Sequence, residues 1–174
     1  MASKVKRPRR VQSRTSLGPV ADLESHLPAE WWRKLFNALY VKTDGDVVEN
    51  KENTRREVDF IVAAAAIQPH SQILDLCCGQ GRHCLELARR GFRNVMGVDR
   101  SRYLVRLAKK RAQAEGLQVV FKEGDARNPR LPEGTFDCVC IMGNSFGYFS
   151  NKQDDERVLT TVGKLLRPSG QIVL

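Results

Sequence analysis

From residue 73 onward, short apolar runs alternate with stretches whose apolar positions recur at helical spacing. The apolar runs occupy residues 73–76, 95–99, 117–125, 136–142 and 171–174. The helical stretches occupy residues 84–90, 101–116 and 154–166. Such alternation is typical of βαβ units, in which helices cover both faces of a parallel sheet. The pattern therefore predicts an α/β fold with a doubly wound, mostly parallel sheet whose strands are the apolar runs.

The first part of the chain has a different, helical pattern. Residues 29–40 place aromatic and aliphatic side chains at helical spacing, and residues 41–51 contain a Thr-Asp-Gly-Asp turn signal. A second helix is expected to begin at Asn53 or Thr54, either of which is a good helix cap. We therefore divide the chain into a basic tail (1–25), an N-terminal helical lid (26–70) and a parallel-sheet domain (71–174).

Composition narrows the class of protein. Of the 174 residues, 41% are hydrophobic and 28% charged, which excludes a disordered or fibrous protein and predicts one domain with a real core. No apolar run approaches the roughly 20 residues that span a bilayer, and the N-terminus lacks the apolar segment of a secretory signal. We expect a cytoplasmic protein without membrane attachment.

The net charge of +9 is unevenly spread. Residues 1–20 contain six lysines and arginines and no acid, which leaves 23 basic against 20 acidic residues in 21–174. Such a tail is either a solvated, disordered arm or a contact for nucleic acid, an anionic membrane surface or an import receptor. We favour the solvated arm, and binding of nucleic acid through residues 1–20 stays an alternative.

The cysteine spacing does not predict a metal site. The five cysteines stand at positions 77, 78, 84, 138 and 140, inside apolar stretches. A zinc knuckle has Cys-x-x-Cys spacing, which neither the adjacent pair nor the pair at 138 and 140 shows. We expect no metal and no disulfide framework, but reduced, buried thiols that act as small hydrophobic side chains.

A glycine-rich turn follows the first predicted strand, and an acidic residue ends the second. Gly79 and Gly81 allow a tight turn and let a ligand approach the backbone. Asp99 lies 18 residues after Gly81, close to the spacing at which a carboxylate accepts from both hydroxyls of a ribose. The alternative role of Asp99, capping the next helix, is weaker because Ser101 is available as that cap. The pattern predicts a nucleotide-like ligand at this edge of the sheet.

Two cofactors compete for this site. A dinucleotide site has the pattern G-x-G-x-x-G/A, and here Cys84 stands at its third place. Asp75 places a carboxylate near the turn, where it would repel a pyrophosphate and attract a cation. A ligand with a ribose and a positive charge but no phosphate fits better. S-adenosylmethionine is such a ligand.

The stretch ILDLCCGQGRH resembles the first motif, D-x-G-x-G-x-G, of the class I S-adenosylmethionine-dependent methyltransferases. Asp75, Gly79 and Gly81 match this motif, and Cys77 replaces its first glycine. Four further stretches are similar to later motifs of the family: GVDRS (97–101), EGDAR (123–127), FDCVCIMGNSFGYF (136–149) and LLRPSGQIVL (165–174). The resemblance implies a Rossmann-like sheet of order 3-2-1-4-5, with S-adenosylmethionine as cofactor and S-adenosylhomocysteine as product.

The same resemblance implies roles for individual residues. Asp99 holds the ribose, Asp125 accepts from the adenine amino group, and Ala126 supplies a backbone donor. The full set of cofactor-binding residues implied is Asp75, Cys77, Gly79, Gly81, Asp99, Arg100, Asp125, Ala126, Met142 and Asn144.

The motif after the fourth strand bears on the methyl acceptor. DNA methyltransferases that act on exocyclic amines have Asp/Asn-Pro-Pro-Tyr here, whereas this chain has GNSFGYF and no proline. The stretch is closer to small-molecule enzymes of the glycine N-methyltransferase type, which implies a small-molecule acceptor, expected at nitrogen. Asn144 either faces the sulfonium or the amine or satisfies loop backbone, and Tyr40 and Tyr148 are further substrate-side candidates, with core packing as the alternative for Tyr40. Methyl transfer to an amine needs alignment rather than a strong base, so no catalytic residue is assigned.

The resemblance also implies a sixth and a seventh strand. The chain ends at Leu174, on a predicted strand, so we expect a sheet truncated before these strands and an exposed edge through which two copies can pair. Two other functions stay open. One is methylation of RNA or protein with help from residues 1–20, and the other is a non-catalytic subunit that binds the cofactor or a partner.

Overall fold

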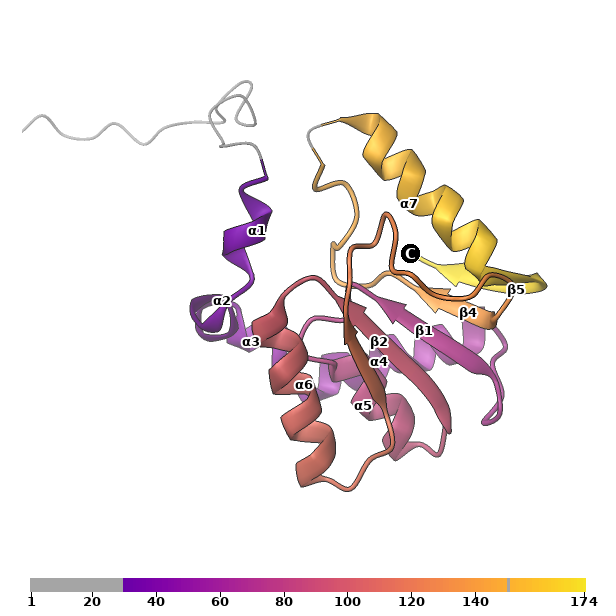
Figure 1. Cartoon of the computed structure of the whole chain (residues 1–174). Coiled ribbons are helices and arrows are strands. Elements are labelled where there is room, and N and C mark those ends of the chain that lie inside the picture. Colours follow the sequence, from indigo (N-terminus) through magenta and orange to yellow (C-terminus); the bar gives the residue numbers. More distant parts are fainter. Residues whose placement is uncertain (1–29, 150) are drawn as a thin grey trace, which may run out of the picture.

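The centre of the molecule is a five-stranded parallel sheet of order β3-β2-β1-β4-β5 (Figure 1). The computed structural model describes residues 30–149 and 151–174. The strands are β1 (Gln72–Leu76), β2 (Asn94–Asp99), β3 (Val120–Glu123), β4 (Phe136–Cys140) and β5 (Leu166–Val173). All four neighbouring pairs run parallel. The α/β fold and the strand order expected from the sequence are confirmed.

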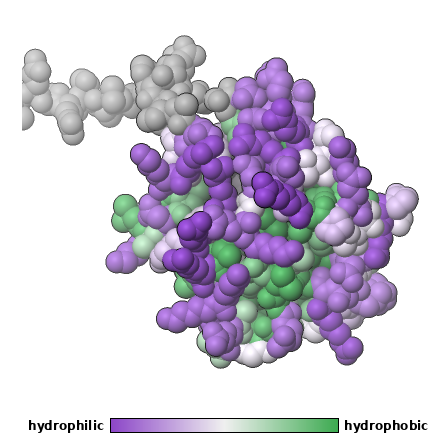
Figure 2. Space-filling model, viewed as in Figure 1, coloured by the Kyte–Doolittle hydropathy of each residue, from purple (hydrophilic) through white to green (hydrophobic). Residues whose placement is uncertain are grey.

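Helices cover the two faces of the sheet unequally. One apolar cluster joins β1 to three helices, α4 (Lys51–Ala64), α5 (Arg82–Arg89) and α6 (Arg102–Ala114). The other cluster joins the opposite face to α7 (Lys152–Leu165). Figure 2 shows hydrophobic side chains gathered over the strands on the face turned to the viewer. None of the helices in the described part of the chain is long and apolar enough to cross a membrane.

The connections place a ligand-binding crevice between two strands. β1 leads into α5 on one face, whereas the neighbouring β4 leads through a loop into α7 on the other. In open α/β sheets the loops part at such a switch point, at the carboxyl ends of the strands. The glycine-rich turn after β1 and the loop after β4 therefore border the same crevice.

The N-terminal segment differs from the expected single helix over 29–40. It forms α1 (Trp32–Leu35) and α2 (Ala38–Thr43), separated at Phe36 and Asn37. The break occurs because the Asn37 side chain accepts a hydrogen bond from the Leu39 backbone N–H at 2.7 Å and so caps a new helix. Residues 41–51, expected as a loop, contain the short helix α3 (Gly45–Val48).

Two further boundaries were wrong for identifiable reasons. α4 begins at Lys51, before Asn53, because Asn50 caps it by accepting from the Asn53 N–H at 3.0 Å. β5 begins at Leu166 and runs through residues 167–170, which were expected to form a turn before the strand. The turn-forming residues lie instead in an irregularity of the β4–β5 ladder. The expected Ser101 cap of α6 is confirmed, with its hydroxyl 3.2 Å from the Leu104 N–H.

β2 lies so close to its neighbours that we expect Gly97 to tolerate no side chain. A Cβ added at Gly97 would lie 2.7 Å from the Phe121 ring and 2.8 Å from the Cys78 sulfur. We expect Gly97→Ala to lower the free energy of unfolding by about 2 kcal/mol through overpacking. Gly163→Ala, in α7 with no atom within 4 Å of the added methyl, is the control and should be stabilising by up to about 1 kcal/mol. Urea denaturation of both variants measures the difference, and equal stability would contradict the packing described.

Candidate cofactor site

The turn after β1 has an unusual backbone at the position of Cys77. The Cys77 and Cys78 N–H groups both donate to the Val98 carbonyl, at 2.7 and 3.0 Å, which fastens the turn to β2. Cys77 has a φ of +66°, in the left-handed region that favours glycine. A side chain in this conformation costs roughly 1–2 kcal/mol. Burial raises the pKa of the Cys77 thiol well above its usual range, so the sulfur stays protonated.

The two glycines of the turn serve different purposes. Gly79 has a φ of +54° and lines the cavity above the turn. Gly81 has a φ of +78° and lies beneath the turn, where an added Cβ would be 2.7 Å from the Phe121 ring and 3.0 Å from Ala108. Gly81 is therefore required by the packing of α5 against α6 and β3. Its direct contact with a cofactor stays a prediction.

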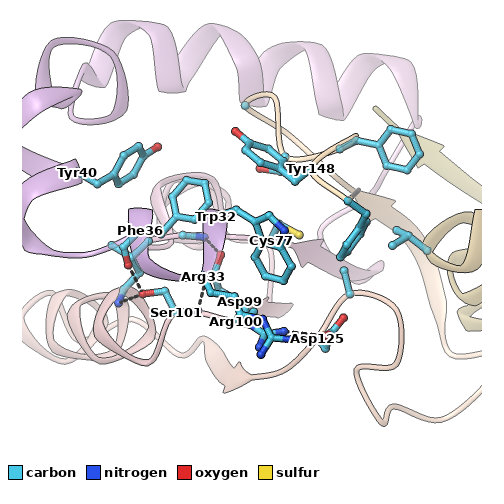
Figure 3. A pocket seen from close by; sticks show the side chains of 18 residues that line it. Trp32, Arg33, Phe36, Tyr40, Cys77, Asp99, Arg100, Ser101, Asp125 and Tyr148 are labelled. Carbon is cyan, nitrogen blue, oxygen red and sulfur yellow. Dashed lines mark hydrogen bonds and ion pairs between the residues drawn. The ribbon is translucent and has the colours of Figure 1, made fainter. Parts of the chain in front are cut away.

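Asp99 ties the end of β2 to the glycine turn. Its Oδ2 accepts from the Gly79 N–H at 2.8 Å, and its Oδ1 accepts from the Ser101 N–H at 2.7 Å. Burial raises the pKa of this carboxyl, and these two N–H groups oppose the rise. A carboxylate has about four acceptor sites, so each oxygen keeps one for a ligand. Asp99, Cys77 and Gly79 line one cavity, as the spacing in the sequence required (Figure 3).

Asp125 reaches the same cavity but is already engaged by arginines. Its oxygens accept from the Arg100 guanidinium at 2.9 Å, and from the Arg127 guanidinium and backbone N–H at 2.7–3.0 Å. The Arg127 contacts hold the pKa of the Asp125 carboxyl below its usual range. Acceptance from an adenine amino group stays a prediction, because it requires one of these donors to share its oxygen. Ala126 and Arg100 also line the cavity.

Asp75 lies under the turn rather than in the cavity. It is 1% exposed, and its Oδ1 has no hydrogen-bond partner among the described residues. Its Oδ2 accepts from the Cys84 thiol at 3.3 Å and lies 3.8 Å from His83 Nδ1. Burial raises the pKa of the Asp75 carboxyl. A buried oxygen without a hydrogen-bond donor is an atom whose bonding capacity a ligand cation or a bridging water can satisfy.

A polar network that the sequence reasoning missed supports this turn from α4. His83 Nε2 lies 2.8 Å from a Glu57 oxygen, and the Arg82 guanidinium pairs with the same carboxylate. The His83 hydrogen bond lowers the pKa of Glu57 to about 2, so this carboxylate is ionised at neutral pH. Glu57 and Arg82 come from elements distant in sequence and carry no motif, so no local signal paired them.

The outer wall of the cavity is aromatic. It combines side chains of the N-terminal segment with side chains of the loop after β4: Trp32, Phe36, Tyr40, Phe146, Tyr148 and Phe149. The ring centroids of Trp32 and Phe149 are 5.5 Å apart, and those of Phe36 and Tyr148 are 5.7 Å apart. Gly143 and Ser145 line the cavity between these rings. The wall therefore closes the crevice with the two segments that the sequence had named as lid and substrate side.

Four of the ten residues expected at the cofactor are not among those that line the cavity: Asp75 and Gly81, which lie beneath the turn, and Met142 and Asn144. Met142 packs against the apolar core that includes α4, α5 and α6. Asn144 is exposed, with a φ of +57°. Their roles at the cofactor stay predictions, and Gly143 and Ser145 take the lining positions next to them.

Residues 73–170 match the family described as Methyltransferase domain. This match covers more than half of the chain and spans every strand from β1 to most of β5. The chain belongs to this family. The strand order is that of class I methyltransferases, which use S-adenosylmethionine, and a SAM-dependent methyltransferase from Methanosarcina mazei superposes with a TM-score of 0.58 at 26% identity, over 64% of this chain and 54% of that one.

The curated relatives act on different acceptors. Demethylmenaquinone methyltransferase of Thermus thermophilus is 36% identical over 121 residues, which is 69% of this chain and 51% of that protein. EEF1A lysine methyltransferase 2 of Danio rerio is 32% identical over 156 residues, 83% of this chain and 66% of that protein. Glycine/sarcosine N-methyltransferase of Halorhodospira halochloris is 26% identical over 131 residues, which is 74% of this chain and 48% of that protein. The chain spans about half the length of most of these methyltransferases.

Solved structures agree on the fold of the methyltransferase domain. An S-adenosylmethionine-dependent methyltransferase from Clostridium acetobutylicum superposes with a TM-score of 0.64 at 22% identity, over 77% of this chain and 53% of that one. The [4+2]-cyclase SpnF superposes with a TM-score of 0.61 at 25% identity, over 67% of this chain and 42% of that one. One fold thus carries more than one chemistry, so the reaction has to be argued from the site.

The residues of this methyltransferase domain fit S-adenosylmethionine. Asp99 offers free acceptor sites to the ribose hydroxyls, and Gly79 exposes backbone beside it. Asp75 lies beneath the turn and outside the cavity, so its attraction for a positively charged methionine arm stays a prediction. No group of three or more potential ligands that could hold a metal ion occurs in the part of the chain described. The Asp99 carboxylate is the acceptor that a ribose requires.

Removing the Asp99 carboxylate should weaken cofactor binding directly. We expect Asp99→Ala to weaken S-adenosylmethionine binding at least tenfold, about 1.4 kcal/mol or more, because two ribose hydrogen bonds are lost. Isothermal titration calorimetry measures the dissociation constant. Asp59→Ala, which removes an exposed carboxylate on α4, is the matched control and should bind like wild type. An unchanged dissociation constant in folded Asp99→Ala would contradict the ribose assignment.

The backbone at Cys77 generates a second prediction. Cys77→Gly should be more stable than Cys77→Ala by about 1 kcal/mol, because only glycine adopts a φ of +66° without a steric cost. The two variants both lack the thiol, so their comparison isolates the backbone effect. Their urea unfolding midpoints provide the measurement. If the alanine variant were the more stable of the two, the left-handed conformation of this residue would be wrong.

Proposed function

We propose that this protein transfers the methyl group of S-adenosylmethionine to a nitrogen of a small molecule. The supporting observation is the shared cavity, in which Cys77, Gly79 and Asp99 lie opposite the aromatic wall that includes Tyr40 and Tyr148. The cofactor supplies an electrophilic methyl group on a sulfonium. The chain's own residues orient the reactants and exclude water around them, which is the main demand of an in-line displacement.

The titratable groups of the cavity favour nitrogen over oxygen as acceptor. Burial raises the pKa of both Tyr40 and Tyr148, so their hydroxyls stay neutral at physiological pH and do not act as bases. The described lining contains no histidine or lysine. A hydroxyl acceptor needs a base in the site to become nucleophilic, whereas an amine that has lost its ammonium proton to solvent has a free lone pair. We propose Tyr40 and Tyr148, rather than Asn144, as the substrate-side residues.

A protein lysine side chain is the second candidate acceptor. The similarity to EEF1A lysine methyltransferase 2 extends over 156 residues, further than the 121 residues shared with the Thermus thermophilus quinone enzyme. Lysine offers the same amine chemistry as a small molecule. Residues 1–20, whose contribution to RNA or protein binding stays a prediction, lie outside the described residues.

Transfer of a labelled methyl group distinguishes these acceptors. The protein is given S-adenosylmethionine with a radioactive methyl group and, in parallel, pools of small amines, small alcohols and phenols, lysine-containing peptides, and RNA. We expect label in the small-amine pool, and its absence from Asp99→Ala. Label in the peptide or RNA pool alone would replace the small-molecule acceptor by that alternative. Binding of S-adenosylhomocysteine without transfer to any pool would favour a non-catalytic role.

A further inference from the structure

Five of the six aromatic side chains of the cavity fall into two groups, and the sixth, Phe146, packs against the apolar cluster that includes α7. Trp32 and Phe149 already have arginine partners, with guanidinium carbons 4.7–5.5 Å from the ring centroids. Phe36, Tyr40 and Tyr148 have no such cationic partner within the described chain. Trp32 is next to Arg100, and Phe149 is next to Arg127. We call the second group the acceptor cage.

The three rings of the acceptor cage stand at steep angles to one another. The Phe36 and Tyr40 centroids are 5.0 Å apart with an angle of 81° between the ring planes. The Phe36 and Tyr148 centroids are 5.7 Å apart with an angle of 72°. Tyr40 and Tyr148 extend toward one another from opposite sides of the cavity (Figure 3). At these distances and angles Phe36 is in edge-to-face contact with both tyrosine rings, so the three rings form one continuous aromatic surface of the cavity.

The cavity lining contains two carboxylates, Asp99 and Asp125, and two guanidinium groups, of which Arg33 is paired with Glu30 and Arg100 with Asp125. Asp99 lines the same cavity, and its charge contributes to the raised pKa of Tyr40. Burial is the main cause of the raised pKa of Tyr40 and Tyr148, and the charge of Asp44, an exposed residue at the junction of α2 and α3, adds to it. Arg82, whose charge opposes the rise at Tyr40, is ion-paired with Glu57, so Asp99 is the charged group of the lining that has no ion pair among the described residues. The field at the rings therefore favours a positive group.

We propose that the acceptor cage of Phe36, Tyr40 and Tyr148 binds an alkylammonium group, so that the acceptor is an aliphatic amine. This inference rests on the proposed methyl transfer and names the substrate class of that same site. Ring faces attract a cation within about 6 Å of their centroids, and nearby carboxylates strengthen the attraction. A neutral acceptor, such as a quinol, gains no cation–π attraction from these rings, and an anionic acceptor is repelled by the Asp99 carboxylate.

The reaction is consistent with a cationic acceptor and a cationic product. The bound ammonium first releases one proton to solvent, which leaves a neutral lone pair on nitrogen. That lone pair forms the bond to the methyl carbon while the sulfur–carbon bond breaks, and its electron pair remains on sulfur. The nitrogen then carries the positive charge that the sulfonium lost. The cage therefore faces a positive charge before and after transfer.

A matched pair of probes tests the cage without knowledge of the natural acceptor. Choline and 3,3-dimethylbutan-1-ol have the same shape, but only choline carries a positive charge. Their dissociation constants are measured by ligand-observed NMR with the protein saturated with S-adenosylhomocysteine. We expect choline to bind at least fivefold more tightly, which corresponds to about 1 kcal/mol of cation–π attraction.

Substitutions assign the preference to the rings. Tyr148→Leu and Phe36→Leu should each lower the preference for choline at least twofold, whereas Tyr148→Phe should retain it because the ring remains. Phe60→Leu, at an aromatic residue of α4 that is 57% exposed and remote from the cavity, is the control. S-adenosylhomocysteine binding shows which variants are folded, and two leucine variants are made so that one misfolded protein leaves the test intact.

The outcomes separate this inference from the function on which it rests. If S-adenosylhomocysteine binds and the two probes bind equally, the cage is wrong while methyl transfer stands. A preference for choline that survives both leucine substitutions also overturns the cage. If the wild-type protein does not bind S-adenosylhomocysteine at all, the proposed function fails, and this inference fails with it.

Discussion

The cofactor site depends on one carboxylate that bridges two backbone segments. Asp99 accepts from Gly79 in the turn after β1 and from Ser101 at the start of α6. Without these bonds two N–H groups near the cavity would lose their partners, at a cost of about 1–3 kcal/mol for each that stays buried. The same residue therefore holds the turn in place and offers the remaining acceptor sites to a ribose. A change at Asp99 therefore affects both the conformation of the turn and the acceptor sites offered to a ligand.

The regular parts of the site were predictable because their signals are local. Short apolar runs, the Ser101 cap and the spacing from Gly81 to Asp99 each depend on residues close in sequence, and the parallel topology then brings the strand ends together. The family resemblance added Asp125 and Ala126, which do line the cavity. The strand order and the Ser101 cap are thereby confirmed, whereas the roles of Asp99, Asp125 and Ala126 at the cofactor stay predictions.

The missed features all depend on contacts between distant segments or on competing local hydrogen bonds. The pairing of Glu57 with Arg82 and His83 joins α4 to α5, and no sequence feature of either helix predicts this contact. The break between α1 and α2 follows from the side chain of Asn37, whose choice between helix interior and cap is not decided by periodicity. Asp125 was expected to accept from the adenine amino group, and its contacts with Arg100 and Arg127 were not foreseen.

The Ser101 hydroxyl gives the N-terminal helices a mechanical connection to the ligand site. It donates to the Phe36 carbonyl at 2.7 Å, while the N–H of the same residue donates to Asp99. Because Phe36 sits where α1 and α2 part, any swing of these helices away from the sheet pulls on a residue adjacent to the ribose carboxylate. The position of the N-terminal helices and the position of the Asp99 carboxylate are therefore coupled through Ser101.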